Sequence, residues 1–314
     1  MALCTNITQI YLMVSVIISS ADAAQLRQVT DSINSTIGVP FQLIAIDNSA
    51  GKKGICEVYN TGAQTAEYDV LCFMHEDVVI KTNNWGQVLV NIFKNDAEIG
   101  LLGIAGSSYK SLSPSPWGGH AIDTKYTNFE QCYKHEDKAP QVLYRNPKNV
   151  KLAQVACIDG VFMCTTKQVF AEYQFDERLL KGFHIYDVDY SLTVGQKYKV
   201  AVTYDIFLSH LSEGSYGKDW MQDNIEVHKK WNMYLPVNIE GLTLKQQQIV
   251  EKVSFKSFIN ELIGFNMPLI IAYEMLNKNN RFVKLYFKTF IKLNFYLIKV
   301  RSKASDWWLK FYFL

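Results

Sequence analysis

The residues His75-Glu76-Asp77 have the side chains of a metal site. They directly follow an apolar run, residues 70–74. A carboxylate beside an imidazole can hold a divalent metal, and such a metal can bridge the oxygens of a diphosphate. The alternative interpretation is a strand end with solvated charges and a structural histidine. The sequence by itself leaves both interpretations open.

A second set of acidic residues has the pattern of a catalytic base. Asp159-Gly160 interrupts an apolar run over residues 155–163, and Asp187 and Asp189 lie near the start of an expected helix. Residues two apart on a helix point in different directions, so only one carboxylate of this pair can face a substrate. The other can stabilise the helix N-terminus electrostatically. Both could instead do no more than cap that helix.

Alternating strands and helices are expected to position these groups. Apolar runs predict strands over residues 12–18, 41–46, 70–74 and 99–105, and helical periodicity predicts helices over 21–37, 54–66 and 85–95. This order favours an α/β fold with a doubly wound, mainly parallel sheet flanked by helices. Ligands bind such sheets at the carboxyl ends of the strands. The polar residues there are Ser19, Asp47, Asn48, His75, Glu76 and Asp77.

The runs VSVIISS, LIAIDNS and YNTGAQTAEYDVLCFMHEDV resemble, in this order, the nucleotide-binding half of family 2 glycosyltransferases of the GT-A fold. They are most similar to the subgroup typified by a streptomycin-biosynthesis protein. The resemblance implies that Asp77 binds a Mn²⁺ or Mg²⁺ ion that holds the diphosphate of a sugar donor. It places Asp47 at the nucleotide base or ribose. His75 stands where the family usually has the first Asp of an Asp-x-Asp motif, and an imidazole brings no negative charge.

The later motifs extend the resemblance to about residue 217. Family 2 enzymes carry a stretch similar to residues 182–192, and the match makes Asp187 the catalytic base of an inverting transfer to a carbohydrate or lipid-linked acceptor. Asp159, Gly160 and Asp189 are expected on the acceptor side, and His210 is expected at the metal. Trp117 lies in a Pro- and Gly-rich loop, where its indole could stack on a sugar or base, or form part of a plain turn.

Two other functions stay open at this point. A nucleotidyltransferase can share such a sheet and metal, but residues 19–22, Ser-Ser-Ala-Asp, lack the Gly-rich basic loop expected after its first strand. The second is a non-catalytic protein that binds sugar nucleotides. In such a protein, His75 in place of the usual Asp would mark the loss of metal chemistry. No GxGxxG or P-loop motif occurs, so neither a dinucleotide site nor a P-loop is indicated.

The charge distribution divides the chain near residue 235. Residues 1–235 contain 20 Lys and Arg against 25 Asp and Glu, whereas residues 236–314 contain 12 against 5. We therefore expect a catalytic domain over 1–235 and a basic helical region over 236–314. Residues 278–305 contain eight basic residues and no acidic one. This pattern favours contact with an anionic membrane surface, although packing on the body or on a second subunit is the alternative. The acidic body argues against nucleic acid as a partner.

The cysteines and the N-terminus bear on the compartment. Six cysteines occur without a CxxC pair, and Cys72 and Cys164 lie in apolar runs, as reduced thiols do in protein cores. The apolar run 10–18 has no positively charged segment before it and is too short to span a bilayer. A cytoplasmic protein at the inner face of the membrane is therefore expected.

Overall fold

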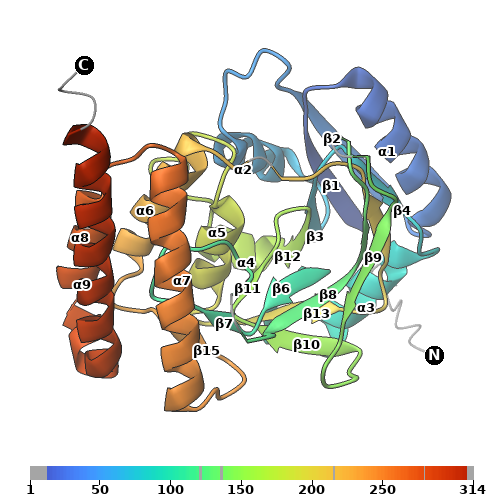
Figure 1. The fold of residues 1–314 in the computed structure, drawn as a ribbon. Helices are drawn as coiled ribbons and strands as arrows, with labels where there is room; N and C mark the ends of the chain where they lie inside the picture. The colour runs from blue at the N-terminus through green and yellow to red at the C-terminus, as the bar shows by residue number, and fades with distance from the viewer. Residues whose placement is uncertain (1–12, 120–121, 135–136, 215, 279, 310–314) are drawn as a thin grey trace, which may run out of the picture.

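A seven-stranded mixed sheet forms the centre of the computed structural model, which describes residues 13–119, 122–134, 137–214, 216–278 and 280–309 (Figure 1). The strand order is β10-β13-β5-β12-β3-β1-β2. The bounds are β1 (Val14–Ser20), β2 (Phe41–Asp47), β3 (Val70–Met74), β5 (Ile99–Gly103), β10 (Leu152–Val155), β12 (Phe162–Thr166) and β13 (Lys199–Thr203). The strands predicted over 41–46 and 70–74 are confirmed, and the predicted strand 12–18 begins and ends two residues later; residue 12 lies outside the described residues.

Five of these strands run in the same direction, and two run against them. The β1, β2 and β3 strands pair in parallel, as do β5 and β13. The β12 strand is antiparallel to both β3 and β5, and β10 is antiparallel to β13. The prediction of a mainly parallel sheet is confirmed. The insertion of β12 between β3 and β5 was not predicted, because this pairing joins segments far apart in the sequence.

Helices cover both faces of the sheet. On one face lie α1 (Ala23–Thr36) and α3 (Trp85–Asn95), and on the other lie α2 (Ile55–Thr65), α4 (Lys167–Glu172), α5 (Tyr186–Val194) and α6 (Lys218–Lys230). The apolar side chains of β3 alternate between the two cores, with Val70, Cys72 and Met74 on one side and Leu71 and Phe73 on the other. Such two-sided burial explains why this strand is a continuous apolar run.

A smaller sheet brings the downstream histidine to the end of β3. Its order is β11-β6-β8-β14-β4, with β9 paired to β8. The bounds are β4 (Val78–Ile80), β6 (Ala105–Ser107), β8 (Lys125–Gln131), β9 (Gln141–Arg145), β11 (Cys157–Ile158) and β14 (Leu208–His210). His210 is the register partner of Val78, the residue after Asp77. The pairing of β14 with β4 therefore places His210 beside the His75-Glu76-Asp77 turn.

The C-terminal region packs on the body through one face. It consists of β15 (Val237–Asn238), paired with β7 (Tyr109–Lys110), and of α7 (Leu244–Gly264), α8 (Ile270–Asn277) and α9 (Asn280–Leu309). On α9, Phe282, Tyr286, Leu293 and Leu297 are buried in the same cluster as core residues of the sheet. The predicted fold class, a doubly wound sheet flanked by helices with a helical C-terminal extension, is confirmed. In the described part of the chain, no helix is long and apolar enough to cross a bilayer.

Candidate functional site

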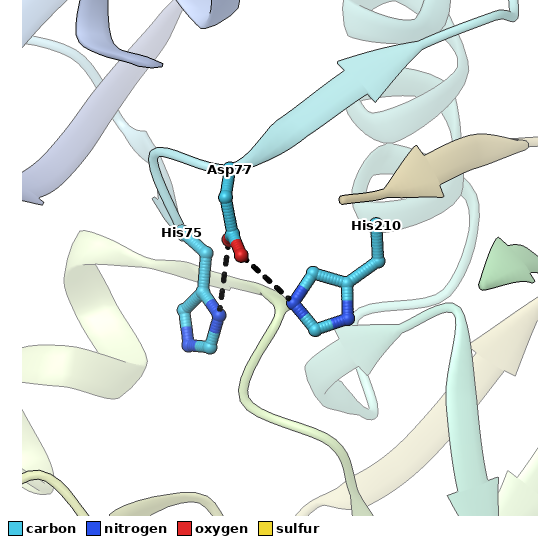
Figure 2. Close-up of side chains that lie close together, drawn as sticks. All are labelled: His75, Asp77 and His210. Atoms are coloured by element: carbon cyan, nitrogen blue, oxygen red, sulfur yellow. Dashed lines mark ion pairs between the residues drawn. The ribbon is translucent and has the colours of Figure 1, made fainter. Parts of the chain in front are cut away.

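The turn between β3 and β4 carries the candidate metal ligands. His75 and Asp77 lie on this turn, and His210 lies at the end of the neighbouring strand β14 (Figure 2). His75 Nδ1 is 3.8 Å from Asp77 Oδ1, and His210 Nε2 is 3.4 Å from Asp77 Oδ2. One potential ligand atom from each of the three residues lies within 4.8 Å of the others. The structure therefore brings together all three residues that the sequence predicted as metal ligands.

Hydrogen bonding decides which nitrogen of His75 can bind a metal. His75 Nε2 lies 2.8 Å from Tyr186 Oη, and the same hydroxyl donates to Gly160 O at 3.2 Å. Because a tyrosine hydroxyl has one proton, it must accept from the Nε2–H of His75. Nδ1 then carries the lone pair and faces the Asp77 carboxylate, so two acceptors face each other with no proton between them. This arrangement suits a cation between them.

Asp77 and His75 also have the charge states that a divalent metal requires. Burial raises the pKa of Asp77, but the hydrogen bond and charge of His210 outweigh it and hold that pKa well below its usual value. Burial and the neighbouring His210 lower the pKa of His75. Burial lowers the pKa of His210, but the hydrogen bond and charge of Asp77 outweigh it and raise that pKa, so a metal would displace a proton from His210. Two imidazole nitrogens and one carboxylate oxygen form a donor set that Mn²⁺ and other first-row divalent metals accept. The residues present thus fit the predicted metal.

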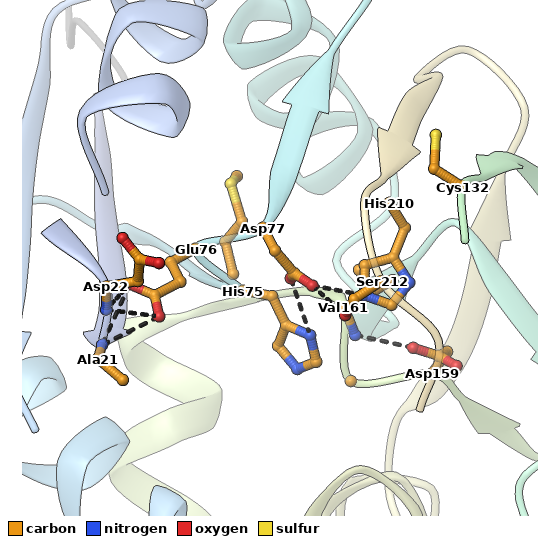
Figure 3. A network of polar contacts seen from close by, with 12 residues as sticks. Ala21, Asp22, His75, Glu76, Asp77, Cys132, Asp159, Val161, His210 and Ser212 are labelled. Atoms are coloured by element: carbon orange, nitrogen blue, oxygen red, sulfur yellow. Dashed lines mark hydrogen bonds and ion pairs between the residues drawn. The ribbon is translucent and has the colours of Figure 1, made fainter. Parts of the chain in front are cut away.

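Glu76 points away from the metal ligands and toward the start of α1 (Figure 3). Its carboxylate accepts from the amides of Ala21 and Asp22 at 3.0–3.2 Å, where a helix N-terminus favours negative charge. A cavity of about 290 Å³ opens beside it, lined by Ser19, Asn48, His75, Glu76 and Asp77 among others. We call this the smaller cavity. Five of the six predicted donor-binding residues therefore line one space.

Asp47 is the exception among the predicted donor-binding residues. It ends β2, is exposed, and its carboxylate accepts from the Ser49 amide at 2.9 Å. It is not among the residues lining the smaller cavity. Asn48 is buried instead, and its side chain bonds the backbone of Lys53 in both directions at 2.8 and 3.2 Å. Asn48 thus fixes the loop after β2, whereas Asp47 lies at its outer edge.

A cavity of about 460 Å³ shares part of its lining with the smaller one. We call it the larger cavity; its lining includes Asp159, Gly160, Asp187, His210 and Trp117. His75, Phe183 and Tyr186 line both cavities. The two spaces therefore meet at the hydrogen-bonded His75–Tyr186 pair, next to the candidate metal ligands.

Asp187 is held in the larger cavity by the start of α5. Its carboxylate accepts from the Gly160 amide at 3.1 Å and from the Val188 amide at 2.8 Å. Burial, together with the charge of Asp159, raises the pKa of Asp187 to about 7. A carboxyl group with such a pKa can exchange a proton with a substrate near neutral pH. Asp159 is oriented by the Val161 amide, which its carboxylate binds at 2.8 Å.

Gly160 allows the close contact that joins these groups. A Cβ atom at this position would lie 2.3 Å from Tyr186 Oη, so any other residue here would displace that hydroxyl. The absence of a side chain lets Tyr186 reach both His75 and the Gly160 carbonyl. The glycine after Asp159 is therefore explained by the close contact of the Tyr186 hydroxyl with the backbone, and not by a turn alone.

Asp189 does not reach either cavity, contrary to the acceptor-side position expected from the sequence. The residue is 2% exposed, and its carboxylate accepts from Trp231 Nε1 at 2.7 Å and pairs with Lys230 at 2.8 Å. It joins α5 to the end of α6. The sequence argument that only one of the two aspartates can face a substrate is thus consistent with the geometry, which selects Asp187.

Two residues of the site were missed from the sequence. Tyr186 bridges His75 and Gly160, and the Ser212 hydroxyl donates to Asp77 Oδ2. Neither residue type is distinctive by itself. Tyr186 could have been considered because it directly precedes Asp187, and Ser212 because it follows His210 at the end of the same strand.

The structure thus combines an α/β sheet with a histidine and carboxylate centre between two cavities at its strand ends. The chain belongs to the glycosyltransferase-like family whose model matches residues 13–231. No curated protein matches the sequence.

Solved structures show distant likenesses. A crystal structure of GalNAc-T7 with UDP, GalNAc and Mn²⁺ has 13% identity and a TM-score of 0.49, over 86% of this chain and 58% of that one. The TarS 1–349 structure from S. aureus has 11% identity and a TM-score of 0.45, over 81% and 72%. The chain thus spans little more than half of the GalNAc-T7 chain.

Proposed function

We propose that the protein is an inverting glycosyltransferase that uses a nucleotide-diphosphate sugar and is assisted by Mn²⁺ or Mg²⁺. The observation that supports this most is the meeting of two cavities at the candidate metal ligands: Asp77 lines the smaller cavity, His210 lines the larger cavity with Asp187, and His75 lines both. The smaller cavity would hold the nucleotide donor. The larger cavity would hold a carbohydrate or lipid-linked acceptor. Within the family, the streptomycin-biosynthesis-like subgroup is the one that the strand motifs favour.

In the proposed reaction, Asp187 takes the proton of the acceptor hydroxyl as that oxygen attacks the anomeric carbon of the donor. The bond from that carbon to the diphosphate breaks, and the nucleoside diphosphate leaves with the electron pair. A single in-line displacement of this kind inverts the anomeric configuration. His75, Asp77 and His210 would hold the divalent metal, which supplies positive charge to the leaving diphosphate. Trp117 and Gly160 would orient the acceptor in the larger cavity.

Donor binding tests this proposal without knowledge of the acceptor. We expect one nucleotide sugar of a UDP- and GDP-sugar panel to raise the melting temperature by about 2 °C or more in the presence of Mn²⁺, because a ligand that binds only the folded chain stabilises it. Differential scanning fluorimetry measures the shift. The control is the same panel with EDTA, in which the shift should fall. No shift with any nucleotide sugar, with or without metal, would count against the proposed donor.

We also propose that the C-terminal region binds the surface of an anionic membrane, which would place the protein at the cytoplasmic face. The outer face of α9 carries exposed lysines, among them Lys284, Lys288 and Lys292. Phe287 lies between them and is 57% exposed, and Phe295 and Ile298 follow Lys292 and are 68% and 65% exposed. Lysines interleaved with exposed apolar side chains complement anionic headgroups over an apolar boundary.

Changing Lys284, Lys288 and Lys292 to Glu should weaken binding to vesicles of phosphatidylcholine and phosphatidylglycerol by roughly 100-fold, because each lysine contributes about 1 kcal/mol near such a surface. Co-sedimentation measures the bound fraction. The matched control changes Lys94 and Lys218, exposed on other helices, to Glu and should bind as the wild type does. Equal binding of the wild type and the α9 variant would contradict the membrane proposal, as would a wild-type chain that dimerises but does not sediment with vesicles.

A further inference from the structure

The wall of the larger cavity that carries Trp117 is built on a buried segment, residues 108–117, which we call the Trp117 segment. It includes β7, and residues 108–115 are all buried. Trp117 at its end lines the larger cavity. Buried backbone outside regular structure needs partners for its polar groups. The partners of this segment come in large part from the C-terminal region.

Glu251 of α7 is the central partner. Its side chain is fully buried, and its carboxylate accepts from Tyr109 Oη at 2.7 Å and from the Leu112 amide at 3.0 Å. Burial raises the pKa of Glu251 to about 7. A buried carboxylate is costly unless hydrogen bonds replace the water that it loses. Here those contacts connect α7 to two points of the Trp117 segment.

Two further contacts fix the same segment from the C-terminal side. The β15 strand pairs with β7, with Val237 opposite Lys110. Glu240 accepts from the Ser108 hydroxyl at 2.7 Å. The first half of the segment is therefore fastened to residues 237–251, all of which lie beyond the end of the family match at residue 231.

Lys110 connects β7 to the residues directly before Trp117. Its side chain is 1% exposed, and its ammonium group donates to Ser115 O at 2.6 Å and to Pro116 O at 3.0 Å. Pro116 directly precedes Trp117. Because Lys110 belongs to β7 and is bonded to the carbonyls before Trp117, it joins the start of the segment to its end. The position of the indole thus depends on the position of β7.

We propose that Glu251 is a positioning residue that holds Trp117 at the wall of the larger cavity through the Trp117 segment. The C-terminal region is then a part of the acceptor side and not only an attachment to it. The inference rests on the proposed function only in calling the larger cavity the acceptor side. The contacts themselves do not depend on any substrate.

The test is hydrogen–deuterium exchange of the intact chain, compared between wild type and Glu251→Leu. Leucine leaves the Tyr109 hydroxyl and the Leu112 amide without their acceptor, so exchange in peptides covering 108–117 should become about tenfold faster or more. Exchange in β3, residues 70–74, should stay the same. Glu251→Gln keeps an acceptor oxygen and should restore slow exchange. Should Glu251→Leu fail to fold, Tyr109→Phe removes one donor only and should give a smaller increase in the same peptides.

The matched control is Leu262→Ala, a buried change on the same helix that removes packing but no hydrogen bond to the segment. If it accelerates exchange over 108–117 as much as Glu251→Leu does, or if neither Glu251→Leu nor Tyr109→Phe accelerates it, the inference is overturned. Donor binding by the Glu251→Leu variant is measured in parallel with its exchange. Unchanged segment exchange with intact donor binding contradicts this inference alone, whereas absent donor binding in the wild type contradicts the proposed function alone.

Discussion

Changing Asp187 to Asn is expected to lower glycosyl transfer by about 10²- to 10⁴-fold, which is what a positioned general base contributes. Asparagine keeps the shape of the side chain and can still accept from the Gly160 amide, so the fold should persist. The measurement is steady-state transfer from the donor selected by the binding panel. Circular dichroism and donor-induced thermal shift should match those of the wild type.

Asp189→Asn is the matched control for this change. The two aspartates lie on the same helix, but Asp189 is bonded to Trp231 and Lys230 instead of facing the larger cavity. The Asp189 variant should lose stability and keep transfer. If Asp187→Asn kept near wild-type transfer, or if both variants lost transfer equally, Asp187 would not be the base.

The pH dependence of the wild type gives an independent check on Asp187. Its pKa is raised to about 7, and a base must be unprotonated to act. Transfer should therefore rise about tenfold per pH unit below pH 7 and level off above it. The Asn variant should lose this rise.

The second large effect is expected from the metal ligands. Asp77→Asn removes the only carboxylate of the His75–Asp77–His210 set and with it the negative charge that faces the two imidazoles. Because metal coordination and charge stabilisation are worth several kcal/mol, Mn²⁺ affinity should fall by about 100-fold or more. Isothermal titration with Mn²⁺ alone measures this. Asp31→Asn, an exposed change on α1, should bind Mn²⁺ as the wild type does.

A related substitution examines the role of the Tyr186 hydroxyl in the same titration. Tyr186→Phe leaves the three ligands in place and removes the group that orients His75. We expect a smaller loss, about 10-fold, as is typical when a partner of a metal-binding histidine is removed. Full Mn²⁺ affinity in Asp77→Asn would contradict the assignment of the centre.

The sequence was sufficient for the elements whose pattern is local. The alternation of apolar runs and helix-breaking residues predicts the bounds of β2, β3, α2 and α3 to within one residue. It can do so because the burial pattern of each element is contained in its own residues. It also places His75 and Asp77 at a strand end. The pairing of β12 between β3 and β5 could not be predicted, since it depends on contacts between segments about sixty to ninety residues apart.

The same limit explains the errors within the site. Asp189 shares its helix with Asp187, and only the packing of α6 shows that Trp231 and Lys230 take its carboxylate. Glu251 lies in a region whose charge suggested a membrane role, and nothing in the spacing of α7 indicates its bond to Tyr109. The basic tail likewise has two faces, and the buried one becomes visible only once Phe282 and Leu293 are seen in the core.

We propose that this chain breaks the bond between a sugar and a nucleoside diphosphate with the help of a metal. The most direct measurement is the release of UDP or GDP from the nucleotide sugar that binds best, by the intact wild-type chain, with Mn²⁺ and with EDTA. We expect slow release to water with Mn²⁺, faster release when a suitable acceptor is added, and little release with EDTA. Tight donor binding without release under any of these conditions would contradict it and would identify a protein that binds sugar nucleotides without catalysis.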